Sequence, residues 1–166
     1  YKQADKVFTI SDKMAEKIRL NCPNREVVVV PSWVDTTYMK PLFKPDNWFA
    51  KKHGQVDKLS ILYSGNLGKT HHLESIVETA KVLNTNEAFH FLFIGEGAKK
   101  EKLVSMSNKA NLTNTTFLPY QSAETLPYSI PCGDVAVVSL GAAAGAEHVS
   151  VPSKTLYMLA AGCCTV

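Results

Sequence analysis

Three segments of this chain share one pattern, in which an apolar strand is followed by a bend marked by glycine and then by an amphipathic helix. They are Leu59–His72, His90–Glu101 and Asp134–Lys154. Repeated units of this kind imply right-handed crossovers and a parallel sheet covered on both faces. Glycine lets the backbone approach a ligand closely, and a following helix N-terminus offers unpaired N–H groups with a partial positive charge. The pattern therefore predicts an α/β fold, a Rossmann-like doubly wound parallel sheet, with a phosphate-binding crevice at one edge.

Hydrophobic periodicity and turn residues predict the individual elements. Apolar stripes such as Leu73, Ile76, Val77 and Ala80 indicate helices, whereas β-branched runs such as residues 26–30 indicate buried strands. Strands are expected at residues 6–10, 26–30, 59–64, 89–94, 115–118, 134–140 and 163–166. Helices are expected near residues 11–20, 47–53, 73–83, 103–110, 123–130 and 153–161. The proline-containing stretch 32–58 indicates a linker with a short hinge helix.

Composition excludes several classes of protein. The net charge of +3 is small and the basic residues are spread along the chain, so no nucleic-acid-binding stripe is predicted. No apolar run is long enough to span a bilayer. The four cysteines lack CxxC spacing, which favours reduced thiols in a cytoplasmic protein. The five histidines lack metal-ligand spacing, so no metal site is expected. The chain opens without Met and stops inside an expected strand, which is typical of a fragment of a longer protein.

Several motifs, taken in order, resemble one family. Residues 4–18 read ADKVFTISDKMAEKI and residues 27–42 read VVVVPSWVDTTYMKPL; LYSGNLG, FIGEG, FLPY and VPSKTLYMLAAG follow. Together they resemble the C-terminal, nucleotide-sugar lobe of a GT-B fold glycosyltransferase of the family 4, or group 1, kind, in the style of bacterial polysaccharide biosynthesis. The resemblance covers nearly the whole chain. It implies that residues 1–57 are the end of the acceptor-side lobe, a strand–helix–strand remnant with crossing strand and linker. Residues 58–166 would be the nucleotide-sugar-binding lobe, truncated at its C-terminus.

The resemblance also implies a reaction. Enzymes of this kind transfer a hexosyl group with retention from a nucleoside diphosphate sugar to a hydroxyl acceptor, without a bound metal or other cofactor. The donor would lie on this lobe and a saccharide or lipid-linked saccharide acceptor on the other. No complete catalytic set is therefore expected in this chain, and the isolated fragment is expected to be inactive. The full-length protein would be cytoplasmic or peripheral at the inner membrane face.

Two turns are predicted to bind the donor diphosphate. They are the bend after strand 59–64 and the start of helix 153–161, with the residues Gly65, Asn66, Gly68, Lys69, Ser153 and Lys154. Cleavage of the sugar–phosphate bond leaves negative charge on the diphosphate, which fixed N–H donors and cations stabilise. The alternative interpretation is structural: a plain β–α turn with a surface lysine, and an N-capping serine beside a solvated lysine.

Further residues are predicted to shape the donor pocket. They follow the second and third strands of the repeated units or lie on the last helix, and are Gly95, Gly97, Tyr120, Gln121 and Tyr157. Tyr120 could stack on a ring, and backbone near the strand end binds the base in the family. Gly95 and Gly97 could equally be a tight turn, and Tyr120 could be an ordinary aromatic at a strand end.

The sequence departs from the family pattern at charged positions. Asn66 stands where the family usually has Arg, and the usual Lys would fall near Thr70 or His71. The family usually has acidic residues at the positions of Val149 and Tyr157. Glu147 lies close in sequence to Val149 and could serve in its place. His71 or His72 could supply a cation if protonated. These departures keep two alternatives open, a GT-B nucleotide-sugar epimerase and a non-catalytic GT-B scaffold that pairs with another transferase.

Overall fold

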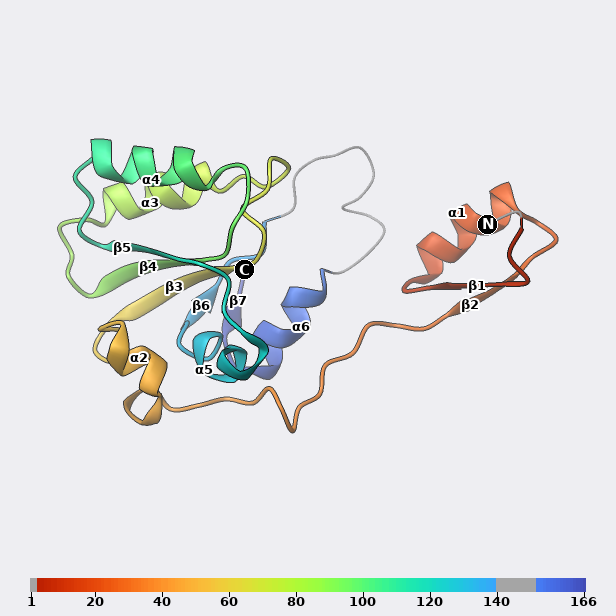
Figure 1. Ribbon diagram of the computed structural model, residues 1–166, viewed down its shortest axis with the longest axis horizontal. Helices are drawn as coiled ribbons and strands as arrows, with labels where there is room; N and C mark the ends of the chain where they lie inside the picture. Colours follow the sequence, from red (N-terminus) through yellow and green to blue (C-terminus); the bar gives the residue numbers. More distant parts are fainter. Residues whose placement is uncertain (1–2, 140–151) are drawn as a thin grey trace. The chain divides into compact units, whose positions relative to one another are not determined.

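The protein consists of two compact units in the computed structural model, which describes residues 3–139 and 152–166 (Figure 1). Among the described residues, the first unit comprises residues 3–33 and 152–153, and the second comprises residues 34–139 and 154–166. The first contains β1 (Lys6–Thr9), α1 (Asp12–Asn21) and β2 (Glu26–Val29), and its two strands pair in parallel. This confirms the predicted strand–helix–strand segment, with each strand one residue shorter than expected.

Local chemistry explains how the first unit closes. Ser11 is the N-cap of α1, and its side chain accepts a hydrogen bond from Met14 N at 3.2 Å. Ala15 and Ile18 lie on one face of α1 and pack with Val7 and Val27 of the two strands. The i, i+3 spacing seen in the sequence is therefore the buried stripe of the helix.

The second unit is built on a parallel sheet of five strands in the order β5-β4-β3-β6-β7. The strands are β3 (Leu59–Ser64), β4 (Phe89–Ile94), β5 (Thr115–Leu118), β6 (Val135–Ala136) and β7 (Cys164–Thr165). The helices are α2 (Trp48–Lys52), α3 (Glu74–Val82), α4 (Lys100–Lys109), α5 (Leu126–Ser129) and α6 (Ser153–Ala160). Short 3-10 helices span Lys44–Asp46 and Ala123–Thr125. The predicted Rossmann-like fold is confirmed.

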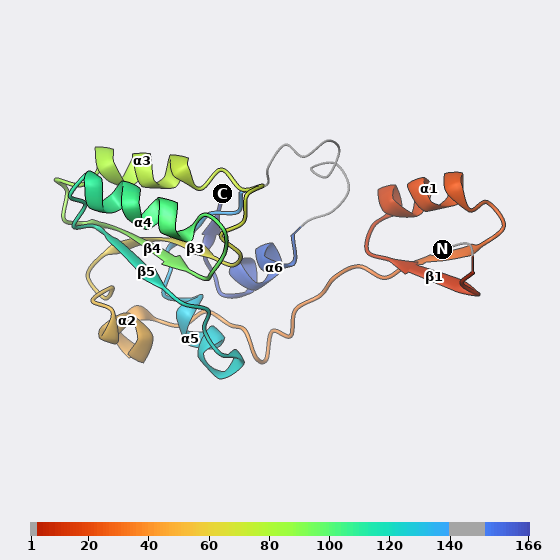
Figure 2. The same ribbon diagram turned by 45° about the horizontal axis from the view of Figure 1, so that its top comes forward.

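Helices cover both faces of this sheet, as Figures 1 and 2 show. On one face α3 and α4 pack against strand side chains such as Tyr63, Phe91 and Phe93. On the other, residues of α2 and α6, including Phe49 and Met158, pack with Leu62, Leu92 and their neighbours. Alternate residues of β3 and β4 therefore point to different cores, which is why these strands read as continuous apolar runs.

Some predicted elements are shorter or divided. The strand expected at 134–140 forms only two pairs with β3, Ile61 with Val135 and Leu62 with Ala136. Its predicted last residue, Leu140, lies outside the described residues. The helix expected at 123–130 is split into a 3-10 turn and α5, because Pro127 fits only the first turn of a helix.

The segment before β3 is part of the second unit. Met39, Phe49 and Ala50 are fully buried in the core beneath α6. Asn47 caps α2 by accepting from Phe49 N at 2.9 Å, and its amide donates to the carbonyl of Tyr128 at 2.8 Å. Residues 34–57 therefore belong to the same compact unit as the sheet. The predicted boundary after residue 57, between the acceptor-side lobe and the donor lobe of the whole protein, stays a prediction.

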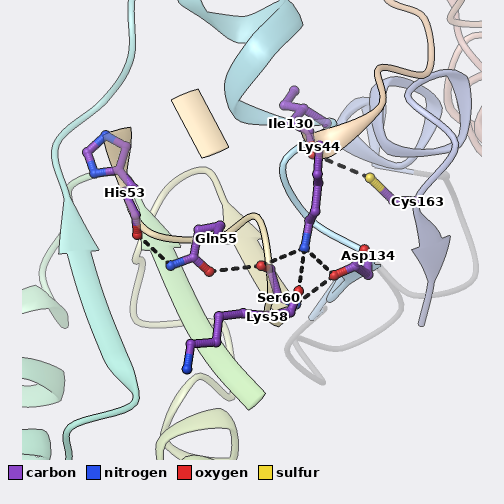
Figure 3. Close-up of polar contacts among 8 residues, drawn as sticks. All are labelled: Lys44, His53, Gln55, Lys58, Ser60, Ile130, Asp134 and Cys163. Carbon is purple, nitrogen blue, oxygen red and sulfur yellow. Dashed lines mark hydrogen bonds and ion pairs between the residues drawn. The ribbon is translucent and has the colours of Figure 1, made fainter. Parts of the chain in front are cut away.

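A polar network fastens this segment to the start of β3 and β6 (Figure 3). The ammonium of Lys44 donates to the carbonyl of Lys58 at 2.7 Å and to Ser60 Oγ at 2.9 Å, and it forms an ion pair with Asp134. The same carboxylate accepts from Ser60 N at 2.7 Å, and Ser60 Oγ donates to Gln55 Oε1 at 2.8 Å. One buried lysine therefore joins three segments that are distant in the sequence.

Within the described part of the chain, no helix combines the length and the apolar character that crossing a membrane requires.

Candidate functional site

Sheet topology places the candidate site at the carboxyl ends of the strands. The chain moves from β3 to β4 to β5 on one side and then returns to the other side of β3 as β6. The direction of strand progression therefore reverses at β3, and ligands of doubly wound folds bind at such a switch point. Gly65 follows β3 directly, at the position where the sequence predicted a phosphate-binding bend.

The loop after β3 is hydrogen-bonded to the loop after β4. Gly65 N donates to the carbonyl of Ile94 at 2.9 Å, and Leu67 N donates to the carbonyl of Glu96 at 2.8 Å. The carbonyl of Leu67 accepts from Lys99 N at 2.9 Å, and the Leu67 side chain is fully buried. These bonds fix the path of residues 65–67.

Glycine is required where these loops meet. Gly95 has a φ of +145°, and a β-carbon there would overlap the carbonyl oxygen of Gly65 and lie 3.4 Å from the ring of Tyr120. A β-carbon on Gly97 would lie 2.5 Å from Asn66 Oδ1. The Tyr120 hydroxyl donates to the carbonyl of Glu96 at 3.3 Å. The structure thus brings together the predicted residues Gly65, Asn66, Gly95, Gly97 and Tyr120.

Helix α6 adds a cation to this loop. Lys154 Nζ donates to the hydroxyl of Tyr63 at 3.1 Å and lies 4.4 Å from the centroid of the Tyr63 ring. A β-carbon on Gly65 would be 3.7 Å from the same nitrogen, so the ammonium stands beside the Gly65 backbone. Burial lowers the pKa of the Lys154 ammonium and raises the pKa of Tyr63 to about 12. Gly65 and Lys154 therefore lie side by side, and Ser153 is the exposed first residue of α6.

Other predicted residues lie differently. Lys69 is exposed, and no contact of its side chain with another described residue is recorded. Gln121 donates to the nearby carbonyl of Pro119 at 2.8 Å. Tyr157 is half-buried and packs against the core beneath the sheet.

A β-carbon on Gly68 would lie 3.1 Å from Asn66 Nδ2, so Gly68 belongs to the same turn as Asn66. Val149 and Glu147 lie outside the described residues.

Sequence reasoning missed one residue of this site, Tyr63. Tyr63 resembles any aromatic residue in a buried strand, and its position just before the Ser-Gly bend was the only available signal. His71, named above as a possible cation, is half-buried, and its Nδ1 donates to the carbonyl of Ser139. Its ring packs edge-on against Tyr63, with 6.3 Å between centroids.

The lysines that open α4 form ion pairs beside this loop. Lys99 and Lys102 each place Nζ 2.8 Å from an oxygen of Glu74, and Lys100 pairs with Glu96. Lys99 also donates to the carbonyl of His71. Hydrogen bonds from Lys102 and Lys99 lower the pKa of Glu74 to about 2. Glu74 thus ties the start of α3 to the start of α4.

The Glu74 pair should make stability depend on pH. Glu74→Gln is expected to destabilise the second unit by about 1 kcal/mol at pH 7. A depressed carboxyl pKa contributes stability above its ordinary value of 4.5, and this contribution disappears as pH falls towards 2. Urea unfolding of both proteins from pH 7 to acid would measure the difference. With the exposed Glu78→Gln as control, a difference that does not shrink in acid would contradict the role of the carboxylate.

The arrangement suits a polyanion and shows no metal centre. A fixed loop, an exposed Asn66 amide and a lysine beside Gly65 offer donors and positive charge at one strand edge. Across residues 3–139 and 152–166, no cluster of three or more His, Cys, Asp or Glu side chains could hold a metal ion.

The chain is similar in sequence to known glycosyl transferases. The family model described as glycosyl transferases group 1 matches residues 45–151. WcaI of Escherichia coli strain K12, named as a colanic acid biosynthesis glycosyl transferase, is 32% identical over 163 residues, which are 95% of this chain and 39% of that protein. The chain thus spans well under half the length of this relative.

Solved structures show the same fold at low identity. HepE of Anabaena, crystallised with UDP, superposes with a TM-score of 0.74 at 10% identity, over 98% of this chain and 44% of its own. The pneumococcal O-GlcNAc transferase GtfA, crystallised with UDP and GlcNAc, gives a TM-score of 0.65 at 11% identity, over 98% of this chain and 29% of its own.

Proposed function

This chain belongs to the group 1 glycosyl transferases, which have the GT-B fold, and from that premise we propose that residues 58–166 bind the nucleoside diphosphate sugar donor. The reaction is a retaining transfer of a hexosyl group to a hydroxyl acceptor in polysaccharide assembly. The observation that carries the proposal is the Lys154 ammonium beside the Gly65 backbone at the switch point of the sheet.

The proposed chemistry is stabilisation of the leaving diphosphate. Lys154 is partly desolvated, and a charge acts more strongly on a bound anion in such a place than in open water. The N–H groups of Ser153 and Lys154 begin α6, where the helix dipole favours an anion. The exposed Asn66 amide is a further donor for the diphosphate, and Lys69 supplies a solvated cation.

The remaining donor groups bind the nucleoside. Tyr120 is 55% exposed next to Gly95, so its ring is free to stack on a sugar or base. Gln121 and the neighbouring backbone bind the base edge. HepE and GtfA were each solved with UDP, which makes uracil the first base to test. The acceptor, a saccharide or lipid-linked saccharide, lies on the partner lobe of a cytoplasmic protein, and no metal takes part.

Nucleotide binding tests the proposal. Calorimetry of the protein against UDP, GDP and ADP should give binding to at least one of them. Lys154→Ala is expected to weaken that binding by about tenfold or more, because a charge-assisted hydrogen bond to phosphate is lost. The control is Lys81→Ala, which removes an exposed lysine from the last turn of α3 and should leave binding unchanged.

Two outcomes would count against the donor site. An unchanged affinity in Lys154→Ala would make Lys154 a surface lysine. The absence of heat with all three nucleotides, in a folded sample, would remove the donor function and favour a non-catalytic scaffold. Release of an altered sugar without any acceptor would instead indicate an epimerase.

A further inference from the structure

Tyr63 connects the two elements that form the proposed diphosphate site. It is next to last in β3 and its side chain is 1% exposed. Its hydroxyl lies 2.8 Å from the carbonyl oxygen of Asn66 and 3.1 Å from Lys154 Nζ. A single phenol therefore contacts both the loop after β3 and the first turn of α6.

The direction of these two hydrogen bonds follows from chemistry. A carbonyl can only accept, and an ammonium can only donate. The one proton of the Tyr63 hydroxyl must therefore point to Asn66, and its oxygen must accept from Lys154. Burial raises the pKa of Tyr63 to about 12, so this proton stays in place at neutral pH.

We propose that Tyr63 is a positioning residue whose hydroxyl holds the Lys154 ammonium beside Gly65 before the donor binds. The inference rests on the proposed function of Lys154. A free lysine side chain samples many rotamers, and fixing it in one of them costs conformational entropy. Holding it in advance moves this cost from binding to folding, which raises affinity for the diphosphate.

Packing alone gives no reason for the hydroxyl. The Tyr63 ring lies in the apolar core under α3 and α4, among Leu67, Leu73 and Phe93. A phenylalanine would fill the same space and keep the ring beside Lys154. The hydroxyl is the part that reaches the site. Among the described residues, His71 lies 6.3 Å from Tyr63 between ring centroids, and Tyr120, after burial, also raises the Tyr63 pKa.

Tyr63→Phe in the protein tests this role. The affinity for UDP should fall about five- to tenfold, as expected for one lost hydrogen bond to a charged group. The affinity for UMP should change less than about twofold, because Lys154 acts on the diphosphate. In the Lys154→Ala background, Tyr63→Phe should have almost no further effect on UDP binding. The control is Tyr128→Phe on α5, which removes a phenol hydroxyl beside Trp48 and should leave both affinities unchanged.

Each alternative outcome overturns the inference. An unchanged affinity for UDP would show that the hydroxyl does not position Lys154. An equal loss for UDP and UMP, or the same loss with Lys154 already replaced, would indicate a general structural effect. If Lys154→Ala itself leaves UDP binding intact, the proposed donor site fails as well. A thermal unfolding midpoint close to that of the unmodified protein would confirm that Tyr63→Phe folds.

Discussion

Gly95→Ala is expected to destabilise the second unit by about 3–4 kcal/mol and to abolish nucleotide binding. Two effects add. The φ of +145° at Gly95 is a conformation that residues with a side chain rarely adopt. The new methyl would also overlap the carbonyl oxygen of Gly65, so the loop that faces the diphosphate would be forced away from β4. Urea unfolding and UDP calorimetry would measure the two losses.

Gly54→Ala is the matched control for this prediction. Gly54 also has a positive φ, +64°, but no atom lies within 4 Å of a β-carbon placed there. The Gly54→Ala variant should therefore lose only about 1 kcal/mol of unfolding free energy, the cost of a positive φ in a residue with a side chain. It should bind nucleotide normally. Equal losses in the two variants would show that the contact between the loops after β3 and β4 contributes nothing.

The sequence predicted the fold and much of the candidate site because both depend on local signals. Gly65 and Gly95 each follow an apolar strand, and parallel strands bring such bends to one edge of a sheet. The stripe from Leu73 to Ala80 likewise defined the buried face of α3. Family resemblance then placed Lys154 at the same edge, where the structure has it.

Contacts between distant residues could not be predicted in this way. Tyr63 and Lys154 are separated by 91 positions, and nothing in either neighbourhood marks them as partners. Lys44 and Asp134 are 90 positions apart, and Asp134 was visible only as the first residue of an expected strand. The length of β6 was also overestimated, because the extent of its pairing is set by β3 and β7 rather than by its own apolar residues.

Asp134→Ala is expected to destabilise the second unit by about 3 kcal/mol, because it leaves a charge without its partner. The Lys44 side chain is only 12% exposed, so its ammonium cannot be solvated freely once the carboxylate is gone. Ser60 N, which donates to the same carboxylate at 2.7 Å, loses its acceptor as well. Urea unfolding followed by the fluorescence of Trp48, which lies in this unit, would measure the loss.

Two further variants separate the unpaired charge from the loss of a carboxylate. Glu96→Ala removes a carboxylate of similar exposure, 46% against 43%, from a more exposed lysine, so about 0.5 kcal/mol is expected. Adding Lys44→Met to Asp134→Ala removes the unpaired ammonium and should recover about 1 kcal/mol of the lost unfolding free energy. If the double variant is less stable than Asp134→Ala alone, the buried ammonium stabilises this junction without its carboxylate. The contacts of Lys44 with Lys58 and Ser60 would then anchor the segment before β3 by themselves.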